Sequence, residues 1–245
     1  MLNRYLYIFI IFANILFAKD EIEFNTSLVG FYEDSLYKGT DNSFKFLPLI
    51  YGRYNNLYID GLRLGYTYFD NDKLKSAFEL SSDFLGYKSS DSKYLSSLED
   101  KKNSIDGSIK ISYKFKEDMK FSFLVSKDIN STHNSFNYNI KFDYDVIKNI
   151  DTVLMCYLSF DYYDEKKANY YFGVNKKEAD IRVNQYKLNN TINKIIGVNY
   201  KYYLFKNWSL LSSLKVNFLD KEISNSPIIK EKSQNSFLVG VTYVW

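Results

Sequence analysis

The amino-acid sequence predicts an all-β protein: a transmembrane antiparallel up-and-down β-barrel of about 12 strands, preceded by a cleaved signal peptide. Three observations predict this class. The chain begins with the pattern of a secretory signal, most of the rest alternates apolar and polar residues with a period of two, and the last residues keep this alternation up to a terminal aromatic. Membrane barrels alternate in this way because one strand face meets lipid and the other lines the lumen.

The composition fits a barrel. Of 245 residues 19% are aromatic, with 24 Tyr and 20 Phe, and only 2 are Pro; aromatic side chains suit strands and the girdles of membrane barrels. The mean hydropathy of −0.33 excludes a bundle of membrane helices. The net charge of +3, from 32 basic and 29 acidic residues, gives no electrostatic footprint for nucleic acid.

Residues 1–18 predict the signal peptide. Arg4 supplies its positive region, residues 6–17 its apolar region, and Ala18 a small residue for cleavage. The apolar region is too short to span a bilayer as a helix, although a buried N-terminal helix or an anchor is the alternative interpretation. Residues 19–245 are then expected to form one barrel in the outer membrane of a Gram-negative cell.

The strands are predicted from alternation over 10 to 14 residues, which is long for a soluble sandwich and right for tilted membrane strands. The clearest stretches are 105–116, 136–146, 152–162, 192–204 and 208–220. Short polar turns are expected at 55–56, 70–72, 116–118, 148–149 and 206–207, and longer connections at 34–43, 85–103, 165–190 and 221–234. The count is 11 or 12, and because an even number is expected, a boundary error is placed within 165–190 or 44–70.

The C-terminus resembles the sorting signal by which the barrel assembly machinery recognises outer-membrane barrels. Its apolar side chains alternate up to the last residue: Phe237, Val239, Val241, Tyr243 and Trp245. The expected partners are therefore the lipid of the outer membrane and this machinery.

Nothing in the composition predicts an enzyme. One Cys (Cys156) and one His (His133) exclude a disulfide framework and make a metal site unexpected, and no cofactor is predicted. His133 with Ser131 or Ser135 is the one conceivable catalytic pair, but this segment is interpreted as a polar loop.

A narrow or plugged channel is an alternative, in which residues 85–103 fold into the lumen. Its predicted lining mixes both signs of charge: Lys110, Lys114, Asn139, Lys141, Asp143, Asp145 and Lys201.

Several segments together resemble the MipA/OmpV family, whose name member is the MltA-interacting protein. In chain order they are Tyr37-Lys-Gly-Thr-Asp41 with the following Pro48, Leu95 to Lys102, Tyr170-Tyr-Phe-Gly-Val174 with Lys177-Glu178-Ala179, Asn207-Trp208, Asn225-Ser226-Pro227-Ile228 and the terminal strand. The departure is a final Trp245 in place of the usual Phe.

The resemblance implies a non-enzymatic barrel that scaffolds cell-wall enzymes, bringing a lytic transglycosylase and a peptidoglycan synthase together at the inner face of the outer membrane. A narrow solute channel and a surface adhesin are the two alternatives. The candidate contact residues are Tyr170, Tyr171, Gly173, Val174, Glu178, Ser226 and Pro227. The structural interpretation, which we favour, is that Gly173 permits a bend, Pro227 is a turn residue and the tyrosines lie in the interfacial girdle.

Overall fold

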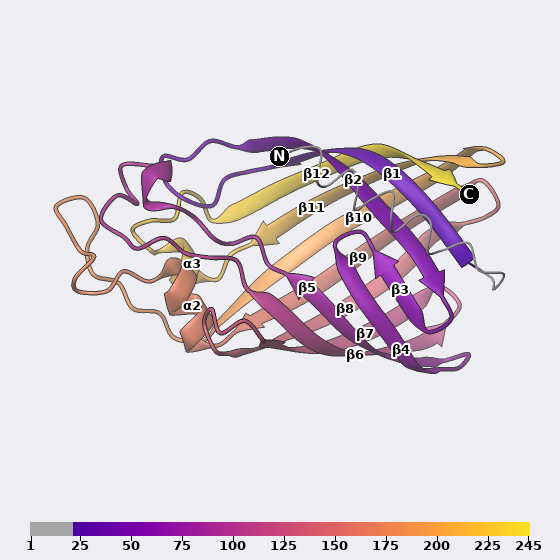
Figure 1. Ribbon diagram of the computed structural model, residues 1–245, viewed down its shortest axis with the longest axis horizontal. Helices are drawn as coiled ribbons and strands as arrows, with labels where there is room; N and C mark the ends of the chain where they lie inside the picture. The colour runs from indigo at the N-terminus through magenta and orange to yellow at the C-terminus, as the bar shows by residue number, and fades with distance from the viewer. Residues whose placement is uncertain (1–21) are drawn as a thin grey trace.

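Twelve antiparallel strands form a closed barrel in the computed structural model, which describes residues 22–245 (Figure 1). The signal peptide predicted at residues 1–18 lies outside the described residues. Each strand pairs with its neighbours in sequence, and β1 closes the barrel against β12, with Asn25 opposite Val244. The up-and-down barrel of 12 strands is confirmed.

The strand bounds follow the predicted alternation closely. They are β1 Ile22–Glu33, β2 Ser43–Tyr54, β3 Leu57–Asp60, β4 Arg63–Asp70, β5 Leu74–Ser82, β6 Ile105–Lys116, β7 Met119–Asp128, β8 Phe136–Lys148, β9 Thr152–Tyr163, β10 Thr191–Phe205, β11 Trp208–Phe218 and β12 Ser233–Val244. The connections carry a 3-10 turn η1 (Ser89–Asp91) and the helices α2 (Glu165–Phe172) and α3 (Lys221–Ser224). Within residues 22–245, no helix has the length and apolar character to cross a membrane.

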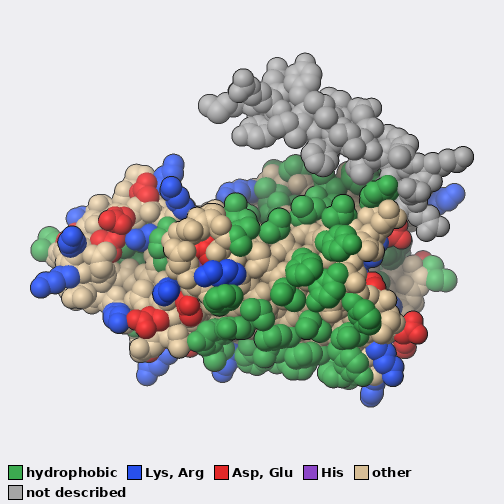
Figure 2. Space-filling model, turned by 60° about the horizontal axis from the view of Figure 1, so that its bottom comes forward, with side chains coloured by type: hydrophobic (Ala, Val, Ile, Leu, Met, Phe, Trp, Pro, Cys, Tyr) green, Lys and Arg blue, Asp and Glu red, His purple; other side chains and the backbone are tan. Residues whose placement is uncertain are grey.

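Alternate residues face lipid and lumen. On β6, Ile109 and Ile111 are exposed on the outside, whereas Ser108 and Ser112 are buried inside and hydrogen-bond to serines of β7. Hydrophobic side chains form a belt across the middle of the molecule, with charged side chains gathered toward its ends (Figure 2). The C-terminal residues Phe237, Val239, Val241 and Trp245 belong to this outer surface, and Tyr243 packs edge-on between Trp208 and Trp245.

The two ends of the barrel differ. The short turns lie at the end where β1 begins and β12 finishes, and the four predicted longer connections all lie at the opposite end, together with residues 129–135 (Figure 1). Because short turns usually face the periplasm, the end with the long connections is the outer end. An even strand number leaves both termini on the periplasmic side.

The hairpin of β3 and β4 is shorter than its neighbours. β3 has four residues, and the chain reverses at Gly61, whose φ of +62° is a conformation that glycine adopts without strain. The ambiguity of the strand count within 44–70 is thus explained, because this segment holds a strand too short to show a period of its own. Residues 165–190 contain no strand.

Closure of the barrel predicts a stability test at Gly240. A Cβ there would lie 2.4 Å from the carbonyl oxygen of Leu28 and 2.8 Å from Cα of Val29, both backbone atoms of β1. We expect Gly240→Ala to lower the free energy of unfolding by about 1–3 kcal/mol, measured by urea titration in phospholipid vesicles. The control is Gly107→Ala, whose nearest contact is the movable Cγ2 of Ile129 at 3.1 Å. Equal losses in the two variants would contradict the close approach of β1 and β12.

Candidate functional site

The long connections fold together into a cap with a hydrophobic core of its own at the outer end of the barrel (Figure 1). We define the cap as residues 34–42, 83–104, 129–135, 164–190 and 219–232. Its buried core consists of Leu36, Tyr37, Tyr87, Leu95, Leu98, Ala168, Tyr171, Phe172, Val174, Val183, Leu188, Ile223, Ile228 and Ile229. Burial of this many apolar side chains gives the connections one packed arrangement.

Helix α2 carries the two adjacent tyrosines into the cap. The side chain of Asp164 caps the helix by accepting from the backbone N–H of Lys167 at 3.0 Å. Tyr171 is 0% exposed and its hydroxyl donates to Asp83 at 2.9 Å, while Tyr170 accepts from the backbone N–H of Lys102 at 3.0 Å. The expectation that these tyrosines lie in the interfacial girdle is therefore wrong, because α2 turns them toward the 83–104 connection.

The residues after α2 form the bend that the sequence predicts. The N–H of Gly173 donates to the carbonyl of Asn169 at 3.0 Å, and a Cβ on Gly173 would lie 2.6 Å from that same oxygen. Glycine is thus required because the backbone of Asn169 lies too close for a Cβ, and not because of an unusual φ. Val174 then pairs with Tyr186 in a two-residue bridge inside the cap.

Glu178 and Ser226 hold separate connections together. The carboxylate of Glu178 lies 3.4 Å from the ammonium of Lys101 and accepts from the backbone N–H of Glu99 at 3.1 Å, with both charged side chains largely buried. The buried hydroxyl of Ser226 donates to the carbonyl of Phe172 at 2.6 Å. Pro227 follows in a turn, as expected. The segments that resemble the family therefore pack against one another in the cap: Tyr37, 95–102, 170–178 and 225–228. No single segment predicts this arrangement.

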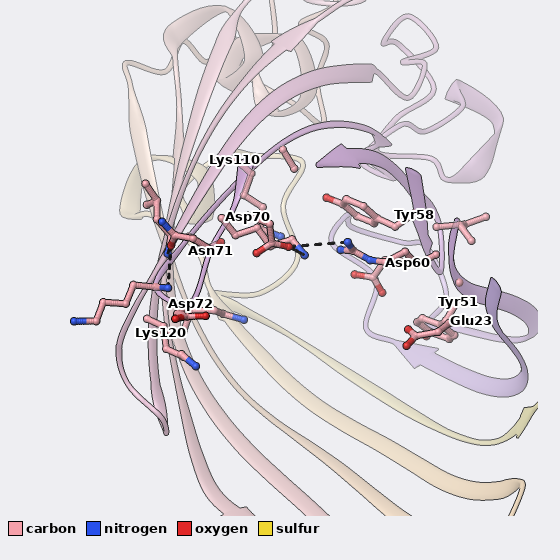
Figure 3. A pocket seen from close by; sticks show the side chains of 18 of the residues that line it. Glu23, Tyr51, Tyr58, Asp60, Asp70, Asn71, Asp72, Lys110 and Lys120 are labelled. Carbon is pink, nitrogen blue, oxygen red and sulfur yellow. Dashed lines mark hydrogen bonds and ion pairs between the residues drawn. The ribbon is translucent and has the colours of Figure 1, made fainter. Parts of the chain in front are cut away.

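The cap roofs a polar lumen. Lys167 of α2 lies 3.2 Å from Asp83 and 3.9 Å from Asp106, across the outer end of the barrel. Beneath it are two cavities of about 720 and 710 Å³. The first, nearer the short turns, has charged side chains on opposite walls (Figure 3). The 83–104 connection packs into the cap instead of filling the lumen as a plug, and of it only Asp83 lines the second cavity.

Several charges inside the lumen are paired, as the mixed signs predict. Glu79 is buried and accepts from Tyr58 at 2.5 Å, with the ammonium of Lys110 at 3.1 Å and Arg63 at 3.3 Å. Asp143 lies 3.2 Å from Lys120 and 2.7 Å from Lys141. The strand registers place all seven predicted lining residues on the inward face.

His133 lies in a loop, as expected, but is buried. Its Nδ1 is 2.6 Å from Oγ of Ser135 and 3.7 Å from Asp128, and its ring packs on Tyr171 with centroids 5.9 Å apart. The pair is enclosed in the cap, where His133 is 6% and Ser135 1% exposed. Within residues 22–245, no group of three or more His, Cys, Asp or Glu side chains is arranged to hold a metal ion.

Comparison with known proteins assigns the family. The family model described as MltA-interacting protein MipA matches residues 27–245. The chain belongs to the MipA family. The outer membrane protein Omp26La of Vibrio anguillarum is 28% identical over 92 residues, which are 38% of this chain and 35% of that protein. The match thus spans about a third of that relative.

Two solved porins are similar to this MipA-family chain. A KdgM porin in complex with disordered oligogalacturonate has a TM-score of 0.48 at 13% identity, covering 90% of this chain and 99% of the porin. A NanC porin has a TM-score of 0.44 at 12% identity, covering 89% and 98%. The closed barrel of twelve strands and the match of residues 27–245 to the MipA model identify this chain as an outer-membrane β-barrel of the MipA family.

The buried ion pair predicts how the cap fails. Lys101→Met leaves the Glu178 carboxylate buried without its cation, which costs about 3–5 kcal/mol for a pair of this kind. We expect proteases to cleave the 164–190 connection faster while the barrel stays intact. The double variant Lys101→Met/Glu178→Gln removes the stranded charge and is expected to recover part of the protection. If proteases cleave the double variant as fast as the single variant, the unpaired charge of Glu178 is not the cause of the faster cleavage.

The buried histidine predicts acid sensitivity of the cap. Burial lowers the pKa of His133, and the charge of Lys167 lowers it further against the opposing effect of Asp128. The unfolded segment, with a pKa of about 6.5, takes up a proton before the folded cap does, so cap stability is complete above that pH and falls below it. We expect hydrogen exchange in 164–190, corrected for its intrinsic pH dependence, to rise between about pH 7.5 and about pH 5. In His133→Gln we expect this rise in hydrogen exchange to be smaller. A rise equal to that of the wild type would show that other groups cause the acid sensitivity.

Proposed function

We propose that this barrel is a non-enzymatic scaffold that binds a peptidoglycan-processing enzyme, in the first place a lytic transglycosylase, at its periplasmic end. The observation that carries the proposal is the match of residues 27–245 to a family described by its interaction with MltA. The geometry supports it, because a roofed outer end leaves the short-turn end as the accessible end of the molecule. A peptidoglycan synthase is the expected second partner.

The seven motif residues are then not the contact surface for this partner. They build the cap, at the end away from the periplasm, and several are fully buried. The short-turn end instead presents Ile150, which is 91% exposed in the turn between β8 and β9. An exposed apolar side chain in a turn can become the buried anchor of a protein contact. The turn is held beside β10 by the backbone N–H of Tyr203, which donates to the backbone carbonyl of Asp151 at 2.9 Å.

The test is a crosslinked pull-down of the tagged protein from intact envelopes, with mass spectrometry. We expect specific recovery of a lytic transglycosylase, reduced several-fold by Ile150→Asp. The matched control is Ile181→Asp, since Ile181 is 101% exposed but lies on the cap. Recovery of only the assembly machinery and abundant porins would overturn the scaffold proposal. Equal loss in both variants would overturn the placement of the contact at Ile150.

A narrow solute channel is the second candidate, and the two lumen cavities favour it. The roof at Lys167 opposes free passage, so the closed form should conduct poorly. We expect the wild-type protein to give little current in planar bilayers and Lys101→Met, with its loosened cap, to give more. Steady conductance of the wild type equal to that of the variant would favour a channel whose route does not cross the cap.

A further inference from the structure

Lysines are concentrated on the inward face of four adjacent strands, β5 to β8. At the centre of this face Ser112 of β6 lies opposite Ser122 of β7, and their hydroxyls are hydrogen-bonded at 2.9 Å. Five lysines surround the two serines as neighbours along and across the strands, and we call them the lysine patch: Lys75, Lys110, Lys114, Lys120 and Lys141. Over their whole described length, by contrast, β11 and β12 turn a single charged residue inward, Lys215.

The lysine patch borders both cavities of the lumen. Lys110 and Lys120 line both of them, and each of the other three lysines lines one. The five side chains are between 29% and 48% exposed although they point inward. Their ammonium groups therefore reach the open space of the lumen and are available to a ligand there.

Carboxylates beside the patch neutralise only part of its charge. Asp143 is shared by Lys120 and Lys141, at 3.2 and 2.7 Å. Asp70 is shared by Lys75 at 3.2 Å and an arginine of β2 at 4.0 Å. The buried glutamate of β5 is likewise held by one lysine of the patch and one arginine. Each carboxylate balances one of its two cations, so an excess of positive charge remains at all three.

Two lysines of the patch face each other directly. The register of β6 and β7 places Lys114 opposite Lys120 on the inward face, and like charges in directly opposed positions destabilise a sheet. Lys114 has an ion-pair partner in Glu117 at 3.3 Å, but the side chain of Glu117 is 92% exposed in the turn. An ion pair as exposed as this one contributes little. An anion between the two ammonium groups would relieve their repulsion.

The acidic side chains across the first cavity do not supply this anion. Asp60 of β3 and Glu23 of β1 lie on the side opposite Lys110 and Lys120 (Figure 3). Among the described residues, neither carboxylate forms an ion pair with the patch. A cleft wall that carries one sign of charge concentrates the field and attracts ions of the opposite sign. The β5–β8 wall is therefore an anion-attracting surface inside the barrel.

The patch is reached from the short-turn end. Residues 71–73, in the turn between β4 and β5, line the first cavity, so this cavity extends to that end of the barrel. At the outer end the cap closes the lumen, where Lys167 pairs with Asp83. A ligand therefore arrives from the periplasm, and the volume of about 720 Å³ is that of a pocket for a small molecule.

We propose that the lysine patch binds a small polyanion from the periplasm, a molecule with two or more phosphate or carboxylate groups. One charged group lies between Lys114 and Lys120, and another reaches the lysines on the other side of the serine pair. Lysine ammonium groups act as point charges, so the patch recognises the number of negative charges more than the group that carries them. The site does not depend on the protein contact proposed at Ile150.

The test is isothermal titration of the folded protein in non-ionic detergent with inorganic pyrophosphate, at constant ionic strength because salt screens exposed charges. We expect saturable binding, competition by citrate, and no competition by acetate, which carries one charge. Binding of pyrophosphate alone or of citrate alone would support the site and assign the natural ligand to phosphates or to carboxylates. Absence of saturable binding by both polyanions, or equal competition by acetate, would overturn the proposal.

A pair of matched variants locates the binding. We expect Lys114→Gln/Lys120→Gln to weaken pyrophosphate binding about tenfold, because charge-assisted hydrogen bonds are lost. The control is Lys201→Gln/Lys215→Gln, which removes the same net charge from inward lysines of β10 and β11, outside the patch. Equal weakening in the two double variants would show a response to overall charge and would overturn the placement of the ligand at the patch.

The wild-type protein provides a second measurement if the patch variant does not fold, as judged by heat-dependent mobility on gels. Lysines are labelled by reductive methylation with and without pyrophosphate, and the modified residues are quantified by mass spectrometry. We expect pyrophosphate to protect Lys114 and Lys120 several-fold more than Lys201. Equal protection of all three lysines, or protection of none, would contradict a ligand bound at the patch.

Discussion

The rest of the structure depends on one constraint: inside a bilayer each backbone N–H and C=O needs a partner within the protein. A sheet meets this demand only by closing on itself, and β1 and β12 do so along Asn25 to Glu33. The close backbone approach at Gly240 belongs to this seam. In an antiparallel barrel, closure also requires an even number of strands, so both termini lie at one end. The short turns share that end, and the long connections lie at the other.

The same constraint makes the upper edge of β2 exceptional. Everywhere else in the described barrel a strand is flanked on both sides over most of its length, but Ser43–Leu49 pairs only with β1. Pro48 sits on this free edge, where its missing N–H leaves one donor fewer to satisfy.

The cap solves a different problem at the outer end. Its connections carry many backbone groups, and side chains such as Glu178, Asp83 and Ser226 accept or donate to them. Charged groups in the cap are buried only with partners, as Lys101 with Glu178 and Lys167 with Asp83. The outer end is thereby packed and roofed, whereas the periplasmic end keeps short, polar turns around an exposed Ile150. This asymmetry separates the packed outer end from the short-turn end, where we propose that an enzyme binds.

The sequence by itself determined the barrel, the inward and outward faces of the most regular strands, and the family. Period-two alternation needs no tertiary information, because it is a property of the strand backbone; the 105–116 stretch therefore matches β6 residue for residue. The short strand Leu57–Asp60 could not be predicted from alternation, because four residues do not define a period. Only the tertiary structure decided that Tyr171 is buried in a cap, that Lys101 pairs with Glu178, and that Ser43–Leu49 of β2 pairs with a strand on one side only. Each of these depends on contacts between segments far apart in the chain, which local patterns do not encode.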